Sequence, residues 1–409
     1  MSRFSRRGML ATSGFGALGI MGLASPAYAR SVTEWKWPAT NSVAGTGANA
    51  DPHMIWDEKA DPVVRALLED GIVPEVNEKL RQWTRNDQPL PDGLPADLRD
   101  FMEEARELPS WVDDDKLAHA VDFNDKRGLY LGTLYAMASG MMSTVIPQEA
   151  LAVYYSKGGA NMKSRIAKTA KLGYDIMSEE AYKPEGEMIV TSVKTRLVHA
   201  AVRHLLPQSP QWQEVAPEEI PISQADIMVT WHSLATTVMQ QLVEWEIPMP
   251  DEESEGYLHT WQIGAHMLGV RDEYIPVSWD AANDQAAQVL DPILAPTREG
   301  IDLADILLGL AEEIDRGILS RPIIGAFTRY VLGDEIAGWL EIPREPVWDR
   351  ALDTFWEPFV AVREGILDRF PGSSDLYWTF DEFLKQFMLF YLSEAQQISI
   401  EIPTTNRPE

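Results

Sequence analysis

The spacing of apolar residues constrains the fold of this 409-residue chain more than any other feature. Over most of the chain, apolar side chains recur every three to four residues, which is the period of a helix that buries one face. The alternation of apolar and polar residues that is typical of strands is nearly absent, apart from the short "ISIEIP" near the C-terminus. The sequence therefore predicts an all-α protein.

The same pattern places individual helices. The stretch "DPVVRALLEDGIVPEVNEKLRQWTRN" predicts two short amphipathic helices that break around residues 71–74, where glycine and proline interrupt the pattern. The stretch "SQADIMVTWHSLATTVMQQLVEWEIPMP" has an N-cap serine, helical periodicity and a stop before proline, which predicts a helix. Similar patterns predict helices over roughly residues 161–178, 187–206, 301–319, 346–370 and 375–396.

One predicted helix carries no charge over nineteen residues, the stretch "GLYLGTLYAMASGMMSTVI" at positions 128–146. Its small residues Gly128, Gly132, Ala136 and Gly140 recur every fourth position, so another surface can approach closely. A buried central helix in tight contact with a neighbour fits this pattern, and so does the wall of an apolar substrate channel. The length would also span a membrane, but no positive flank or second anchor accompanies it.

Residues 1–29 have the features of an export signal. Arg6 and Arg7 precede an apolar, glycine-rich run, and "AYA" supplies a small-x-small cleavage site that ends at Ala29. The paired arginines indicate a twin-arginine signal. We therefore expect secretion through the twin-arginine export machinery, with no stable membrane anchor. That route carries folded proteins, so it suits a protein that acquires a cofactor in the cytoplasm.

The rest of the chain is expected to form one unit. Residues 30–50 are rich in Thr, Asn, Ser, Gly and Ala and are expected to be a flexible leader, whereas residues 51–409 show no repeat and no clear domain boundary. The formal charge is −28, and it becomes −31 without the signal, which holds three arginines and no acid. A protein this acidic repels nucleic acid. We expect a monomer with a single all-α domain.

The absence of cysteine removes several kinds of chemistry. No disulfide, thiol nucleophile, iron–sulfur cluster or thiolate-bound haem is possible. The H-E-x-x-H motif, the Glu-x-x-His pairs of di-iron bundles, the G-x-S-x-G elbow and a phosphate loop do not occur either. His259 and His266 could share a helix face, but no carboxylates accompany them at ligand spacing, so we interpret both as structural.

The stretch "TSVKTRLVHAAVRHLLP" at positions 191–207 places two histidines and two arginines in an apolar, alanine-rich helix. At about 100° per residue, Arg196, His199 and Arg203 fall within roughly 60° of one another, whereas His204 points well away. One face therefore presents a nitrogen ligand between two positive charges. A core histidine held by hydrogen bonds, with arginines at the helix margin, is the alternative.

A b-type haem would suit this face, because a neutral imidazole can bind the iron and arginines can bind the propionates. A second helix, in "GGANMKSRIAKTAKLGYDIM", supports the idea, since Arg165, Lys168 and Thr169 lie on one of its faces. A helix face that carries lysine and arginine is, however, commonly exposed to solvent without binding a ligand. Physical reasoning from these residues therefore leaves haem and a structural histidine as open alternatives.

These two stretches, together with "IPQEAL", "YYSKGGA" and "EGYLHTWQIGAHMLGV", resemble the latex clearing proteins, a family of secreted rubber oxygenases. The resemblance covers nearly the whole chain beyond the signal. It implies a globin-like helical core with additional surrounding helices that holds one haem b. It also implies that O₂ cleaves the double bonds of poly(cis-1,4-isoprene), which leaves oligo-isoprenoids with aldehyde and ketone ends.

The resemblance also implies residue roles. His199 corresponds to the proximal iron ligand, Lys168 to a distal lysine that caps the iron in a closed resting state, and Glu149 to the catalytic base. A lysine binds iron only when neutral, so we expect burial and the charge of Arg165 to lower the pKa of Lys168. We expect burial to raise the pKa of Glu149. Without the resemblance, Glu149 would be an acid at a helix N-terminus, favoured by the helix dipole.

Four polar residues complete the implied haem pocket. Arg165 and Thr169 correspond to residues needed for a functional pocket, and Arg196 and Arg203 to propionate or pocket-stabilising partners. Two further hypotheses stay open. The protein could be an oxygenase of the same family that acts on a smaller isoprenoid or lipid, or an exported haem- or O₂-binding protein without catalysis.

Overall fold

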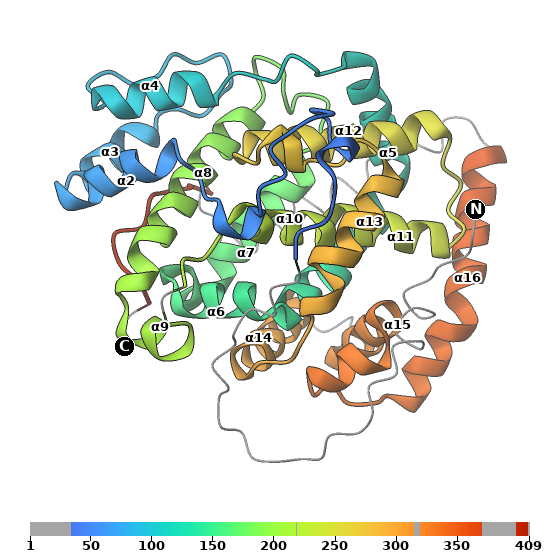
Figure 1. Ribbon diagram of the computed structural model, residues 1–409. Coiled ribbons are helices and arrows are strands. Elements are labelled where there is room, and N and C mark those ends of the chain that lie inside the picture. The colour runs from blue at the N-terminus through green and yellow to red at the C-terminus, as the bar shows by residue number, and fades with distance from the viewer. Residues whose placement is uncertain (1–33, 218, 315–319, 370–397, 408–409) are drawn as a thin grey trace.

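The computed structural model describes residues 34–217, 219–314, 320–369 and 398–407, and these residues are helical throughout their regular parts (Figure 1). Within these ranges β-pairing is limited to two isolated β-bridges, so the all-α prediction is confirmed. The α-helices are α2 (Ala60–Glu69), α3 (Val73–Leu80), α4 (Ala96–Ala105), α5 (Asp114–Leu134), α6 (Pro147–Tyr155), α7 (Met162–Asp175), α8 (Met188–Leu205), α9 (Pro210–Val215), α10 (Gln224–Trp231), α11 (Thr237–Glu244), α12 (Asp251–Met267), α13 (Trp279–Val289), α14 (Arg298–Ile314), α15 (Arg321–Trp339) and α16 (Pro346–Arg369).

The helices expected from periodicity are present within a few residues of their predicted bounds. The break at residues 71–74 separates α2 from α3, and Ser223 caps α10, where its side chain accepts a hydrogen bond from the Asp226 backbone. The helix predicted over residues 375–396 and the signal at residues 1–29 lie outside the described residues.

The centre of the fold is the pair of helices α5 and α12, which pack closely along their length (Figure 1). A Cβ atom at Gly256 of α12 would lie 2.6 Å from the carbonyl oxygen of Lys116 in α5, so only glycine allows this approach. Helix α5 continues as a π-helical segment, η3 (Tyr135–Gly140). The uncharged stretch takes in the second half of α5 and η3, and a Cβ atom at its Gly132 would lie 3.4 Å from the ring of Tyr174 in α7. The predicted close contact of this stretch with a neighbour is therefore confirmed.

None of the described helices is by itself long and apolar enough to cross a bilayer. The pair Asp114–Val145 and Pro147–Tyr155 meets the length and composition test jointly, but its two halves meet at an angle of 92°.

The N-terminal leader is better ordered than its composition suggests. Trp35 and Trp37 are buried in the main core, and the Trp37 indole Nε1 donates a hydrogen bond to the Ala281 carbonyl oxygen at 3.0 Å. The backbone N–H of Val43 donates to the Ile275 carbonyl oxygen at 2.9 Å. The prediction of a flexible leader is therefore wrong for residues 34–43, because burial of two indole rings outweighs the polar residues around them.

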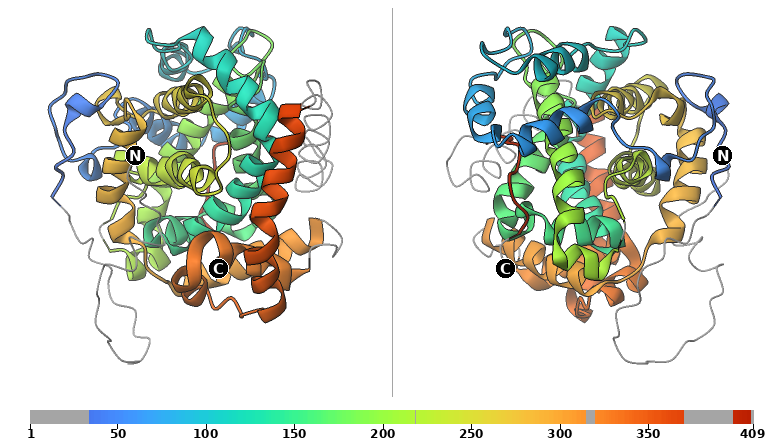
Figure 2. Two further views of the ribbon diagram at one scale, coloured as in Figure 1. Left: turned by 90° about the vertical axis from the view of Figure 1, so that its right-hand side faces the viewer. Right: turned by 60° about the vertical axis from the view of Figure 1, so that its left-hand side comes forward.

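The C-terminal segment, residues 398–407, is not the strand suggested by "ISIEIP". Its Ile402 is buried and pairs with Asn77 of α3: the Asn77 Nδ2 donates to the Ile402 carbonyl at 2.9 Å, and the Ile402 N–H donates to Asn77 Oδ1 at 3.0 Å. The Asn406 Nδ2 donates to the Leu205 carbonyl at 2.7 Å. These bonds fasten the segment across α3 and the end of α8 (Figures 1 and 2).

Candidate active site

A cavity of about 1320 Å³ lies beside α5, enclosed by α6, α7, α8, α10, α12 and α14–α16 and by the C-terminal segment. Pockets for small ligands usually measure about 300–1,000 Å³, so this cavity can hold more than one ordinary ligand. Much of its wall is apolar, with side chains such as Leu129, Met137, Leu307, Phe327 and Trp356. The small residues Gly128, Gly132, Ala136 and Gly140 of the uncharged stretch form part of the same wall, so this helix lines the cavity.

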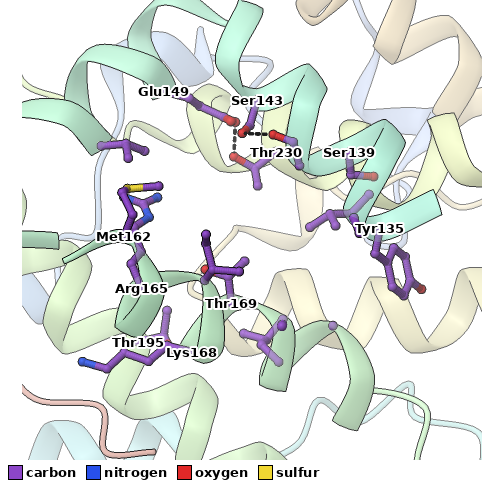
Figure 3. A pocket seen from close by; sticks show the side chains of 18 of the residues that line it. Tyr135, Ser139, Ser143, Glu149, Met162, Arg165, Lys168, Thr169, Thr195 and Thr230 are labelled. Carbon is purple, nitrogen blue, oxygen red and sulfur yellow. Dashed lines mark hydrogen bonds between the residues drawn. The ribbon is translucent and has the colours of Figure 1, made fainter. Parts of the chain in front are cut away.

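Five residues singled out in the sequence meet in this cavity: Glu149, Arg165, Lys168, Thr169 and His199. They come from three helices, α6, α7 and α8. Figure 3 shows Glu149 on one side of the cavity and Arg165, Lys168 and Thr169 on the helix that faces it.

His199 is held in a form suited to binding a metal. Its ring faces the cavity, and its Nδ1 atom is buried without a hydrogen-bond partner among the described residues. Burial, together with the positive charges of Arg203 and Arg165, lowers the pKa of His199 to about 3. The imidazole is therefore neutral at any physiological pH, which is the form that binds iron.

Arg165 is a buried cation on α7, whose first turn is fixed by Asn161: the Asn161 side chain accepts a hydrogen bond from the Ser164 backbone at 3.0 Å. Burial lowers the pKa of Arg165 to about 10, although the carboxylate of Glu149 opposes the shift. The guanidinium thus stays charged at neutral pH. A buried charge of this kind favours an anionic group in the cavity beside it.

Glu149 lies in the first turn of α6, which begins at Pro147. Burial raises the pKa of Glu149 to about 7, while a hydrogen bond from Thr230 and the charge of Arg165 oppose the rise. The Thr230 hydroxyl donates to Glu149 Oε1 (Figure 3). The carboxyl group can therefore gain and lose a proton near neutral pH, as general acid–base chemistry requires.

Lys168 also has a lowered pKa, caused by burial and by the like charge of Lys157, with Glu401 acting in the opposite direction. The expected direction of the pKa shift and its main expected cause, burial, agree with the structure. The additional like charge is that of Lys157 and not that of Arg165. Figure 3 shows the Lys168 side chain pointing away from Glu149, on the side of the C-terminal segment that carries Glu401.

Arg196 and Arg203 are not among the residues that line the cavity. Of their two expected roles, propionate partner or stabilising partner of the pocket, the geometry therefore favours the second. Arg196 forms a two-pronged pair with Asp57, from Nε to Oδ2 at 2.9 Å and from Nη2 to Oδ1 at 3.0 Å. Arg203 donates from Nε to Asp61 Oδ1 at 2.7 Å. Asp57 is buried and Asp61 is half-buried, and carboxylates removed from water need partners. Both arginines therefore fasten α8 to the start of α2, and they act on the pKa of His199 only through the charge of Arg203.

The catalytic-domain model described as "ER-bound oxygenase mpaB/B'/Rubber oxygenase, catalytic domain" matches residues 126–362, more than half of the chain. The chain belongs to this family. It is 56% identical to the "Rubber oxygenase" of Streptomyces sp. (strain K30), over 100% of both chains. Its fold matches the solved structure titled "Structure of Latex Clearing Protein LCP in the closed state" with a TM-score of 0.82 and 56% identity, over 90% of this chain and 99% of that chain.

Sequence reasoning missed Thr230 and the local geometry that brings it to Glu149. In this member of the rubber oxygenase family, the helix after Thr230 widens into a second π-helical segment, η7 (His232–Thr236). It meets η3, where the Ser139 hydroxyl donates to the Ser233 carbonyl at 2.6 Å. π-Helical turns often occur at functional sites, but periodicity analysis does not separate them from ordinary helix.

His259 and His266 have hydrogen-bond partners and do not line the cavity. His259 Nε2 accepts from the Asp113 backbone N–H at 2.9 Å, and His266 Nδ1 lies 2.6 Å from Asp272 Oδ1. The interpretation of His259 and His266 as structural is therefore confirmed.

Proposed function

We propose that this protein is a haem b-dependent dioxygenase that cleaves the double bonds of poly(cis-1,4-isoprene) to oligo-isoprenoids with aldehyde and ketone ends. One observation carries the proposal: a neutral histidine and a carboxyl group with a pKa of about 7 face the same large apolar cavity. The names of the rubber oxygenase and the latex clearing protein that it resembles support the choice of substrate.

The cavity residues fit a haem group. The unpartnered, neutral imidazole of His199 suits an iron ligand, and the buried cation of Arg165 suits the negative charge of a propionate. Thr169 adds a hydroxyl to the same wall. Lys168 has a lowered pKa, so its amine is a candidate for the second ligand of a closed resting state. When bound, the haem would supply the activation of O₂.

The wall of the cavity suits a neutral hydrocarbon chain. Side chains such as Leu307, Phe327 and Trp356 offer apolar contact and no charge. Cleavage of a trisubstituted double bond by O₂ breaks one C=C and one O–O bond, and each carbon keeps one oxygen atom. The products are therefore one ketone and one aldehyde, and no external reductant is required.

Glu149 has the properties of the proton carrier in this reaction. Its ionised form accepts a proton from the allylic carbon of the bound polymer, and the protonated form then returns it, since the two products together contain every hydrogen of the alkene. Thr230 holds one carboxyl oxygen, which leaves the other free to face the substrate. Arg165 stabilises the ionised form across the cavity. General-base assistance of this kind contributes about a hundred- to ten-thousand-fold in rate.

Incubation of the purified protein with polyisoprene latex in air tests the proposal. We expect O₂ consumption and oligo-isoprenoids with one aldehyde and one ketone end, identified by mass spectrometry after carbonyl labelling. Products from a short isoprenoid or lipid but none from latex would favour the smaller-substrate oxygenase. Reversible O₂ binding without any product would favour a carrier.

We also propose that the protein is exported by the twin-arginine machinery and acts outside the cell, because a polymer particle cannot enter a cell. We propose a monomer as its working form. The support for export is the pair Arg6 and Arg7 before an apolar run. The double change Arg6→Lys and Arg7→Lys should retain the protein inside the cell, measured by immunoblot of culture supernatant and cells. Normal amounts of mature protein in the supernatant would contradict this route.

A further inference from the structure

Helix α16 carries an exposed apolar stripe, defined as Trp348, Phe355, Phe359, Val362 and Ile366. These residues are spaced by three, four or seven positions, so they lie along one side of the helix. Phe355 and Val362 are the most exposed members, at 67% and 62%. Figure 2 shows α16 on the outside of the molecule, beside α5. Clustered exposed apolar side chains of this kind mark an interaction surface.

The stripe is continuous with the cavity. Leu352, Trp356 and Phe359 of the same helix line the cavity wall, and at 3.6 residues per turn they occupy the face next to the stripe. Phe359 belongs to both sets, since it lines the cavity and is 45% exposed. The stripe and the part of α16 that lines the cavity are therefore adjacent, and they meet at Phe359.

The charged residues of α16 indicate which kind of surface this helix can bind. The exposed charged residues Arg350, Asp353 and Glu357 lie on the opposite side of the helix from the stripe. Helices that bind anionic membranes usually flank their apolar face with lysine and arginine, whereas this chain has a formal charge of −28. A neutral hydrocarbon is the surface that such a stripe can contact without charge repulsion.

We propose that the α16 stripe is the surface by which the protein adsorbs to solid polyisoprene, and that the polymer passes over Phe359 into the cavity. This inference rests on the proposed function for the identity of the polymer. From Trp348 to Ile366 the stripe is about 27 Å long at 1.5 Å per residue, which is long enough to contact an extended run of the polymer beside the cavity wall at Phe359.

The test measures adsorption separately from cleavage. Purified holoprotein is mixed with synthetic poly(cis-1,4-isoprene) particles, and the protein that remains in the water phase is measured after the particles are removed. The double variant Phe355→Asp/Val362→Asp should bind at least about tenfold more weakly than the unchanged protein, because two exposed apolar contacts are lost and two charges are added. The milder variant Phe355→Ser/Val362→Ser should weaken binding in the same direction.

A matched control carries the same charges at distant exposed positions. Met54→Asp/Val277→Asp alters side chains that are 67% and 51% exposed and lie outside α16. This control should adsorb like the unchanged protein. Circular dichroism and haem content should agree among all variants, and the serine variant replaces the aspartate variant if the latter does not fold.

The outcomes separate the inference from the proposed function. Full adsorption of both α16 variants would overturn the stripe as the polymer surface. A change from dimer to monomer in the variants, measured by light scattering, would also overturn it, because the stripe would then be a contact between copies. If the unchanged protein adsorbs through the stripe but yields no cleavage products, the proposed function fails while the surface stands.

Discussion

Replacing Thr230 by valine should shift the pH dependence of turnover to higher pH. The Thr230 hydroxyl donates a hydrogen bond to Glu149 Oε1, and this bond stabilises the ionised carboxylate that accepts the proton. Burial raises the pKa of Glu149 to about 7 even with this bond in place. Since turnover needs the ionised form, activity of the unchanged protein should rise with pH through about pH 7.

The size of the shift follows from the lost bond. A hydrogen bond to a charged group contributes about 1.5–3 kcal/mol, and one pKa unit corresponds to about 1.4 kcal/mol, so the pKa should rise by about one to two units. The Asp226 carbonyl, 3.2 Å from the same hydroxyl, competes for its hydrogen, which favours the lower figure. A shift of one unit reduces the ionised fraction at pH 7 from about a half to about a tenth, hence turnover by about fivefold.

The assay is initial O₂ consumption with polyisoprene between pH 5.5 and pH 9.5, buffered at constant ionic strength. The variant should regain the activity of the unchanged protein at the alkaline end. Thr133→Val is the control, because Thr133 also lines the cavity but its hydroxyl donates to the Leu129 carbonyl of its own helix. The pH at which activity rises to half its maximum should be the same in this control as in the unchanged protein. If that pH does not change in Thr230→Val, or if activity falls equally at every pH, Glu149 is not a base whose pKa this hydrogen bond lowers.

Three further substitutions separate the roles of residues in and near the cavity. Glu149→Gln should keep haem and fold but lower turnover by about a hundred- to ten-thousand-fold, measured by O₂ uptake beside an unchanged visible spectrum; full activity would remove Glu149 from the mechanism. His199→Ala should abolish haem retention, measured by the Soret band and the pyridine haemochrome, and a full haem complement would show that another group binds the iron. Arg196→Leu should lower the free energy of unfolding by about 3–5 kcal/mol, because it leaves the Asp57 carboxylate buried and unpaired, seen as a lower urea midpoint. The haem-to-protein ratio of folded Arg196→Leu should stay unchanged, and a lowered ratio would restore a direct role in cofactor binding.

Periodicity in the sequence predicted most helices because their apolar faces repeat at a fixed interval. The break between α2 and α3 and the N-cap at Ser223 were equally local, since glycine, proline and a capping hydroxyl act within a few residues. The helix beyond Thr230 was harder to describe. A π-helical turn adds one residue without altering the apolar character of the stretch, so η7 looked like ordinary helix.

The sequence did not reveal which acids pair with the arginines of α8. On a helical projection Arg196 and Arg203 share the face of His199, and nothing in their spacing shows that Asp57 and Asp61 would pair with them. The leader was misjudged for a related reason, since its many small polar residues hid the effect of Trp35 and Trp37. In each case the partner comes from a segment far away in the chain.

The C-terminal segment, residues 398–407, makes the size of the cavity depend on a distant part of the chain. Ile402 and its neighbours enclose one side of the cavity and are held by hydrogen bonds to Asn77 and Leu205. Without these residues the cavity would lack this wall, because the helices that carry Glu149, Arg165 and His199 do not supply it. A change at Asn77, which lies on α3, could therefore alter the cavity through the C-terminal segment that it holds.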